Sequence, residues 1–217
     1  MYGAGGGPAV THTWNCVRGK CPHDCSYCYM RRYRLGTPRL VQAELLKTDL
    51  GENNFIFVGS STDLFASAIQ DDWIKSVLEK CQKHPKNTYL FQSKNPENML
   101  RFTAYFPPKV IIGTTLETNR PVPKEISKAP DPAVRARYLN HFTQTRMVSI
   151  EPIMDFDLKP FSDMIKRLLP DFVSIGADSQ RSGLPEPDPD KVKALILELN
   201  KITNVKLKSN LGRLLNG

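Results

Sequence analysis

Several features are scarce or missing in the 217-residue sequence, and each absence excludes a class of protein. No run of about 18 consecutive apolar residues occurs, so the sequence predicts no membrane-spanning helix. The opening stretch MYGAGGGP lacks the apolar core of a signal peptide, and we expect a flexible lead-in over residues 1–8 and a cytoplasmic protein. No internal repeat or low-complexity linker interrupts the remainder, which predicts one domain over residues 9–217.

Cysteine is also scarce, and its distribution is uneven. Of five cysteines, four fall between Cys16 and Cys28, and only Cys81 lies elsewhere. A secreted disulfide scaffold would spread its cysteines through a shorter chain, so the clustering indicates a metal site in a reduced compartment. Cys81 belongs to an apolar stripe of helical spacing that begins at Ile74, which predicts a buried structural thiol.

Acidic residues are fewer than basic ones. The sequence has 22 Asp and Glu against 30 Lys and Arg, which gives a net charge of +8. This balance favours anionic partners such as nucleic acid, although a solvated basic surface would give the same count. Six of the basic residues surround the cysteines: Arg18, Lys20, Arg31, Arg32, Arg34 and Arg39.

Short, apolar runs typical of buried parallel strands alternate with helical patterns along the chain. The runs span residues 9–14, 54–59, 88–93, 110–116, 147–152, 172–176 and 205–208. Apolar stripes at Ile74–Cys81, Phe161–Leu169 and Val192–Leu199 predict helices that pack on the sheet. A full eight-unit barrel needs ~250 residues, so we expect an α/β fold, a partial (β/α)6 TIM-like barrel of parallel strands. Ligands of such barrels bind where the strands end.

The spacing of three cysteines points to metal chemistry. Cys21, Cys25 and Cys28 form C-x3-C-x2-C directly after the first predicted strand. A structural zinc would take its fourth ligand from His23 or Cys16, and this alternative makes the chain a non-catalytic zinc-binding nucleic-acid module. Three thiolates without a fourth also suit a [4Fe-4S] cluster in which the protein leaves one iron open.

The stretch TWNCVRGKCPHDCSYCY resembles the radical S-adenosylmethionine (SAM) superfamily, whose hallmark is C-x3-C-x-aromatic-C. Tyr27 occupies the aromatic position. The wider sequence is similar to a subgroup that includes spore photoproduct lyase relatives and phage-associated proteins. That subgroup has proline at the position of Cys16, so the resemblance gives Cys16 no ligand role.

The resemblance implies a mechanism and two cofactors. Cys21, Cys25 and Cys28 would bind three irons of a [4Fe-4S] cluster, and SAM would chelate the fourth. The reduced cluster would cleave SAM to a 5′-deoxyadenosyl radical that abstracts hydrogen from a substrate. An external one-electron reductant, such as a flavodoxin or ferredoxin, is implied. An iron–sulfur protein that binds SAM without cleaving it remains a further alternative.

Polar residues follow the predicted strands, where the resemblance places SAM. The segment FVGSSTDLF corresponds to the motif that holds the SAM amino group, although S-S-T-D is also good helix-capping chemistry. Lys94 resembles a lysine that approaches the SAM carboxylate, and an ordinary surface lysine is its alternative. Thr115 and Glu117 alternate and are therefore expected to face one side. The implied SAM contacts are Tyr27, Gly59, Ser60, Ser61, Asp63, Lys94, Thr115 and Glu117.

Later strand ends supply candidates for substrate contact. Glu151 in SIEPI would need a partner if buried, so it either forms a structural ion pair or contacts a ligand. Asp178 and Arg181 follow the sixth strand, where a turn is the simpler use of G-A-D-S. The subgroup and the basic charge imply a nucleic acid or nucleotide substrate. Spore photoproduct lyase carries a late cysteine for radical quenching, and this sequence has none after Cys81.

Overall fold

The computed structural model describes residues 10–216, so the expected lead-in at residues 1–8 lies outside the described part. The strands are β1 (His12–Trp14), β2 (Val17–Arg18), β3 (Arg39–Leu40), β4 (Phe55–Val58), β5 (Thr88–Gln92), β6 (Val110–Thr115), β7 (Thr145–Ile150), β8 (Phe172–Ile175) and β9 (Asn204–Leu207). The α-helices are α1 (Gln42–Lys47), α2 (Asp71–Gln82), α3 (Pro96–Leu100), α4 (Pro132–Leu139), α5 (Leu158–Leu168), α6 (Pro189–Asn200) and α7 (Gly212–Leu215). Short 3-10 helices are η1 (Tyr29–Arg32), η2 (Thr103–Tyr105) and η3 (Ser209–Leu211).

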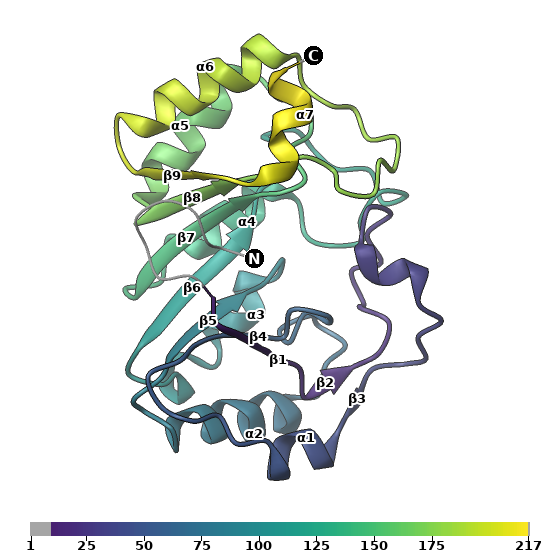
Figure 1. Cartoon of the computed structure of the whole chain (residues 1–217), viewed down its shortest axis with the longest axis vertical. Coiled ribbons are helices and arrows are strands. Elements are labelled where there is room, and N and C mark those ends of the chain that lie inside the picture. The colour runs from purple at the N-terminus through teal and green to yellow at the C-terminus, as the bar shows by residue number, and fades with distance from the viewer. Residues whose placement is uncertain (1–9, 217) are drawn as a thin grey trace.

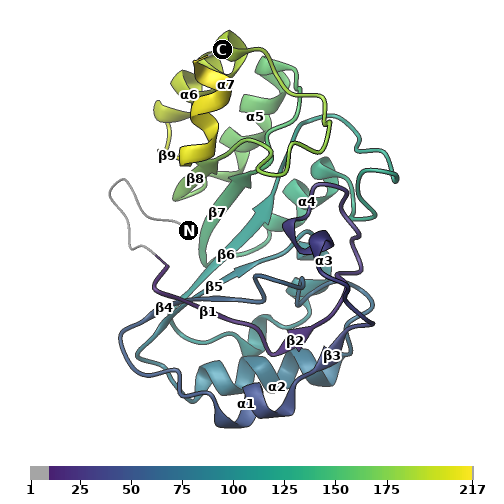
Figure 2. The ribbon, with the colours of Figure 1, turned by 45° about the vertical axis from the view of Figure 1, so that its right-hand side comes forward.

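Seven strands form one parallel sheet in the order β1-β4-β5-β6-β7-β8-β9. Each strand therefore lies beside the strand that precedes it in this sheet, as in a TIM barrel. The sheet curves, and the helices lie along its outer side (Figures 1 and 2). The predicted fold class, a partial TIM-like barrel, is confirmed. The seventh strand, β9, corresponds to the run predicted over residues 205–208, and gives one strand more than the six units of the predicted barrel.

Successive side chains along each strand point to opposite faces of the sheet, and apolar side chains on both faces form two apolar layers. Ile56 belongs to the main core between sheet and helices, whereas its neighbour Phe55 packs in a smaller cluster on the opposite face with Leu90 and Met147. The predicted helix stripe over Ile74–Cys81 is fully buried in α2. The two faces together explain why the strands read as almost continuous apolar runs.

One residue of the predicted stripes is placed differently. Helix α5 ends at Leu168, and Leu169 is 72% exposed with φ 45° and ψ 55°. Leu169 therefore terminates the helix in the left-handed conformation and does not contribute to the core. The following Pro170 cannot continue an α-helix, which fits an end at this point.

Between β1 and α1 the chain makes a long excursion that the sequence pattern did not predict. The two-residue strands β2 and β3 pair antiparallel, Val17 with Leu40 and Arg18 with Arg39. They form the base of a projecting segment that carries the cysteines and η1, drawn in purple to dark blue in Figure 1. This segment stands at the ends of the parallel strands, where ligands of barrel proteins bind.

No helix among residues 10–216 is long and apolar enough to cross a membrane.

Candidate functional site

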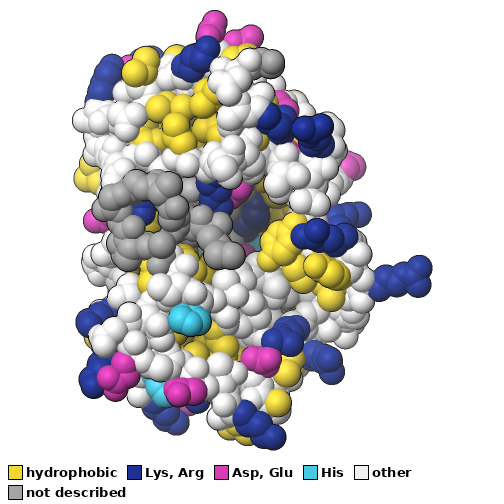
Figure 3. Space-filling model, viewed as in Figure 1, with side chains coloured by type: hydrophobic (Ala, Val, Ile, Leu, Met, Phe, Trp, Pro, Cys, Tyr) yellow, Lys and Arg dark blue, Asp and Glu magenta, His cyan; other side chains and the backbone are white. Residues whose placement is uncertain are grey.

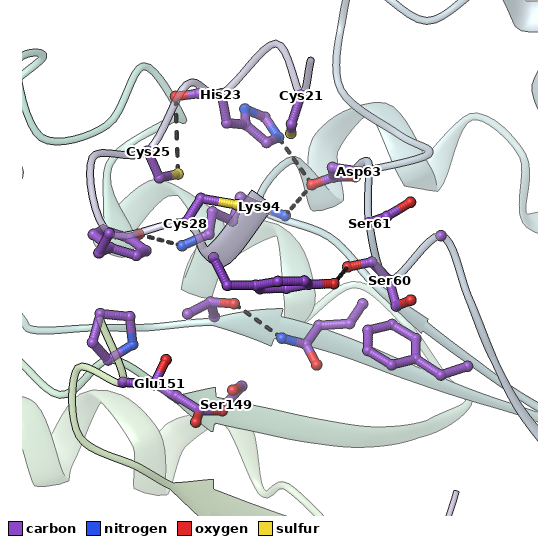
Figure 4. A pocket seen from close by; sticks show the side chains of 18 of the residues that line it. Cys21, His23, Cys25, Cys28, Ser60, Ser61, Asp63, Lys94, Ser149 and Glu151 are labelled. Atoms are coloured by element: carbon purple, nitrogen blue, oxygen red, sulfur yellow. Dashed lines mark hydrogen bonds and ion pairs between the residues drawn. The ribbon is translucent and has the colours of Figure 1, made fainter. Parts of the chain in front are cut away.

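A cavity of about 430 Å³ lies at the C-terminal ends of the strands. Loop residues that follow β1, β4, β5, β7 and β8 contribute to its wall, together with strand residues (Figure 4). Most of the predicted site residues line it: Cys21, Cys25, Tyr27, Cys28, Gly59, Ser60, Ser61, Asp63, Lys94, Thr115, Glu151 and Asp178. Two do not, because Glu117 is fully buried behind the wall and Arg181 is exposed on the surface.

The three cysteines of the motif also border a second cavity of about 160 Å³. All three thiols are free. Burial raises the pKa of Cys21 to about 12 and also raises that of Cys28. No three His, Cys, Asp or Glu side chains within residues 10–216 are grouped as ligands of a metal ion. Three thiols that line both cavities from one loop offer the soft sulfur ligands that an iron–sulfur group takes.

The cysteine loop is held by a segment about one hundred residues later in the chain. Ser26 N donates to Ile126 O at 2.7 Å, and Lys128 N donates to His23 O at 2.7 Å. Between them, the Cys25 thiol and the Ser127 hydroxyl lie 3.2 Å apart. The loop after β6 thus fixes the backbone on which the thiols are displayed.

A buried His–Asp pair joins the cysteine loop to the end of β4. His23 Nε2 lies 2.9 Å from Asp63 Oδ2, and His23 is only 5% exposed. The same carboxylate accepts from Ser93 Oγ at 3.0 Å and from Lys94 N at 2.7 Å. Burial would raise the pKa of Asp63, but His23 and these donors lower it overall. Asp63 therefore ties three strand-end segments together, and its predicted contact with the SAM amino group stays a prediction.

The serines after β4 are ordered by an asparagine that follows β1. Asn15 Oδ1 accepts from Ser61 N at 3.0 Å and from Ser61 Oγ at 3.0 Å, and Asn15 Nδ2 donates to Ser60 Oγ at 3.1 Å. Gly59 has φ 75°, a conformation that favours glycine, and turns the chain toward the cavity. Tyr29 Oη also donates to Ser60 O at 3.1 Å, as the dashed line in Figure 4 marks.

A buried charge cluster backs the cavity wall at Lys94. Glu117 is 0% exposed, and its carboxylate accepts from Arg135 Nη2 at 2.7 Å, from Tyr27 Oη at 2.5 Å and from Lys94 Nζ. Burial alone would raise the pKa of Glu117, but the Arg135 and Lys94 cations lower it well below its ordinary value. Two cations share one carboxylate, so the cluster keeps a net positive charge beside the cavity.

The two residues predicted from alternation at the end of β6 are placed differently. Thr115 lines the cavity and accepts from Gln92 Nε2 at 3.1 Å. Glu117 does not line it, but its carboxylate bonds Tyr27 and Lys94, which do. Glu117 therefore positions these two side chains, and its predicted contact with SAM stays a prediction.

The candidate substrate residues occupy the side of the cavity formed by β7, β8 and β9. Glu151 is partly exposed rather than buried, and it pairs with Lys208 and accepts from Asn210 Nδ2 at 3.3 Å. Asp178 is 2% exposed and accepts from Gln180 N at 2.9 Å and from Ser182 N. Both carboxylates line the cavity, yet each also has a structural role in its loop.

The family described as "Protein of unknown function (DUF5131)" matches residues 9–182. The chain belongs to the DUF5131 family. No curated protein matches it.

Solved structures of spore photoproduct lyase share the fold of this DUF5131 protein. A mutant with dinucleoside spore photoproduct has a TM-score of 0.62 at 11% identity, over 92% of this chain and 75% of the other. A cysteine-to-serine mutant has a TM-score of 0.64 at 10% identity, over 94% and 78%. A mutant with bound AdoMet and dinucleoside spore photoproduct has a TM-score of 0.58 at 12% identity, over 88% and 61%. At these identities the likeness establishes the fold.

Several site residues of this DUF5131 protein had no sequence signal. Asn15 and Ser127 stand in loops without a spacing pattern, and Arg135 belongs to a helix whose sequence, PAVRARYL, reads as solvent-facing. His23 offered one usable signal, its position inside the cysteine motif. Cys16 is 2% exposed in the main core and lines neither cavity, which agrees with its interpretation as a spectator thiol.

Proposed function

We propose that this DUF5131 protein is a radical SAM enzyme with a [4Fe-4S] cluster on Cys21, Cys25 and Cys28. The observation that carries the proposal is the placement of three free thiols on one loop, facing a 430 Å³ cavity at the strand ends of a partial parallel barrel. Cofactor sites typically have volumes of about 300–1,000 Å³. The spore photoproduct lyase structures of the same fold include one with bound AdoMet.

The cluster and SAM, when bound, would supply a 5′-deoxyadenosyl radical that removes a hydrogen atom from the substrate. The chain's own residues would bind SAM and orient it. Ser60 and Ser61, ordered by Asn15, offer hydroxyls for the SAM amino group. Lys94 offers a cation for its carboxylate, held in place by Glu117. Tyr27 and Thr115 complete the wall of the cofactor half.

We propose a nucleic acid or nucleotide as the substrate. Three of the similar lyase structures contain a dinucleoside photoproduct, and the net charge of +8 favours a polyanion. Glu151 and Asp178 would face the substrate within the cavity. Arg181 lies outside, so it would reach only a substrate that extends beyond the cavity. A cytoplasmic flavodoxin or ferredoxin would supply the electron.

Anaerobic reconstitution with iron and sulfide tests the proposal. We expect a brown protein with about four irons per chain. Cys25→Ala should lose the cluster, whereas the control Cys16→Ala should retain it because Cys16 lies in the core. Dithionite-reduced protein should then convert SAM to 5′-deoxyadenosine. A colourless protein with one zinc would refute the proposal, and a cluster without SAM cleavage would reduce it to SAM binding.

A further inference from the structure

The projecting segment around the cysteines concentrates the positive charge of the chain. Residues 18–39 contain six Lys and Arg and a single acidic residue, Asp24. Asp24 is shared by Lys20 at 3.1 Å, Arg31 at 3.2 Å and, from the later loop, Lys128 at 3.0 Å. One carboxylate therefore faces three cations, and a large positive excess remains on this surface.

The positive surface adjoins the cysteine loop, and Arg32 lies over the ring of Tyr29, which lines the 430 Å³ cavity. The 160 Å³ cavity is bounded by the three cysteines and by Lys20, Asp24, Met30, Arg31, Tyr33 and Leu35. Lys20, Arg31 and Tyr33 border this smaller cavity and do not line the larger one. A molecule bound on them would therefore contact residues other than those proposed to hold SAM and substrate.

Exposed tyrosines are interleaved with this charge. Tyr29 is 40% exposed and Tyr33 is 53% exposed. The Arg32 guanidinium lies 6.0 Å from the centre of the Tyr29 ring and 5.4 Å from that of Tyr33. Figure 3 shows Lys and Arg side chains around a hydrophobic group on the right-hand side of the molecule. Tyrosine and arginine are the residues enriched at protein interfaces, whereas an isolated basic surface lacks the aromatic component.

We propose that this outer basic face, defined by Lys20, Arg31, Arg32, Tyr33 and Arg34, is the docking surface for an acidic one-electron donor protein of the flavodoxin type. The inference rests on the proposed function. The donor's flavin hydroquinone would lose one electron and become a semiquinone, and the proposed cluster on the cysteines that border this face would gain that electron. Complementary charge accelerates such encounters, and transient redox complexes need only a small interface.

The arrangement of the tyrosines favours a protein over a nucleic acid strand. Single-stranded nucleic acid binds by stacking its bases on open aromatic faces. Here Arg32 covers one face of Tyr33 and approaches Tyr29, whose hydroxyl is already bonded to Ser60 O. The rings therefore stabilise the basic segment and leave little open platform for bases.

Charge reversal tests the surface. The variant Arg32→Glu/Arg34→Glu changes two exposed arginines of the outer basic face. The matched control, Arg137→Glu/Arg167→Glu, makes the same charge change on α4 and α5, and Arg137 also lies over a tyrosine ring, at 4.9 Å. Binding of oxidised flavodoxin to each reconstituted protein is measured by calorimetry at low and high salt. Stopped-flow absorbance then follows cluster reduction by reduced flavodoxin and, separately, by dithionite.

We expect the Arg32/Arg34 variant to lose about tenfold or more in flavodoxin affinity and reduction rate at low salt, with the difference narrowing at high salt. The Arg137/Arg167 control should match the parent protein in flavodoxin affinity and reduction rate. Dithionite should reduce the parent and both variants at the same rate. Equal behaviour of both variants toward flavodoxin would overturn the proposal. The proposal would also be overturned if the Arg32/Arg34 variant still bound flavodoxin but no longer bound a single-stranded oligodeoxynucleotide. Failure of the proposed function looks different, because dithionite would then yield no 5′-deoxyadenosine from the parent protein.

Discussion

Replacement of Glu117 by glutamine tests the reasoning about the buried charge cluster. The carboxylate has no solvent exposure, and its partner Arg135 has a 1% exposed side chain. Glutamine keeps the shape but removes the charge, so Arg135 and Lys94 lose their common counter-ion. Removal of one partner from a buried ion pair costs about 3–5 kcal/mol, because an uncompensated charge stays buried.

The expected loss of stability is large enough to measure by thermal unfolding. For a chain of this size, 1 kcal/mol shifts Tm by about 2–4 °C, so Glu117→Gln should lower Tm by roughly 6–20 °C. The control is Glu52→Gln, which removes an exposed pair with Lys86 whose side chains are 61% and 63% exposed. That change should cost less than about 1 kcal/mol. Equal effects of the two substitutions would refute the assignment of Glu117 as the centre of the cluster.

The lowered pKa of Glu117 predicts that the stability difference between the parent protein and Glu117→Gln depends on pH. The pKa of Glu117 is lowered by folding, so its contribution is present above the unfolded value of about 4.3 and is lost as pH falls below it. The stability difference between parent and Glu117→Gln should therefore shrink in acid. A difference that stays constant from neutral pH to about pH 3 would contradict the lowered pKa.

Two further substitutions test backbone and packing. Leu169→Gly should stabilise the protein by about 0.5–1 kcal/mol in urea unfolding. The reason is that an exposed leucine at φ 45° is strained, whereas glycine adopts this conformation without strain. An unchanged or lower stability would argue against strain at this position. Gly176→Ala should destabilise by about 1–3 kcal/mol, since a Cβ there would lie 2.7 Å from Glu151 Oε1 and 3.0 Å from Asn210 Oδ1. A stability equal to that of the parent would show that both side chains move aside freely.

The strands were predictable because a strand that is buried on both faces consists almost entirely of consecutive apolar residues. Val110–Thr115 is buried at every position, and its predicted bounds differ from β6 by one residue. The ribbon of β2 and β3 has only two residues in each strand, too few for any periodicity to register. Its pairing depends on where the chain returns after the cysteines.

The candidate site was predictable where a motif has fixed spacing or where polar residues follow a predicted strand, as Lys94, Thr115, Glu151 and Asp178 do. The cysteines and the serines after β4 were found in this way, and the structure brings them to one cavity. Arg135 could not be found, because a charged residue in a short helix reads as a surface residue unless its buried partner is known. Alternation placed Thr115 and Glu117 near one ligand, whereas only Thr115 lines the cavity and Glu117 is joined to it through Tyr27 and Lys94.

The hydrogen bonds between the cysteine loop and residues 126–128 have a consequence for the order of events during synthesis. Ser127 is 102 positions after Cys25, so the ribosome must add about a hundred residues before the loop can be closed. At about 5–20 residues per second, this takes roughly 5–20 s. During that interval the nascent thiols lack the segment that later holds them. Insertion of the proposed cluster is thus expected only after β1, β4, β5 and β6 have been made.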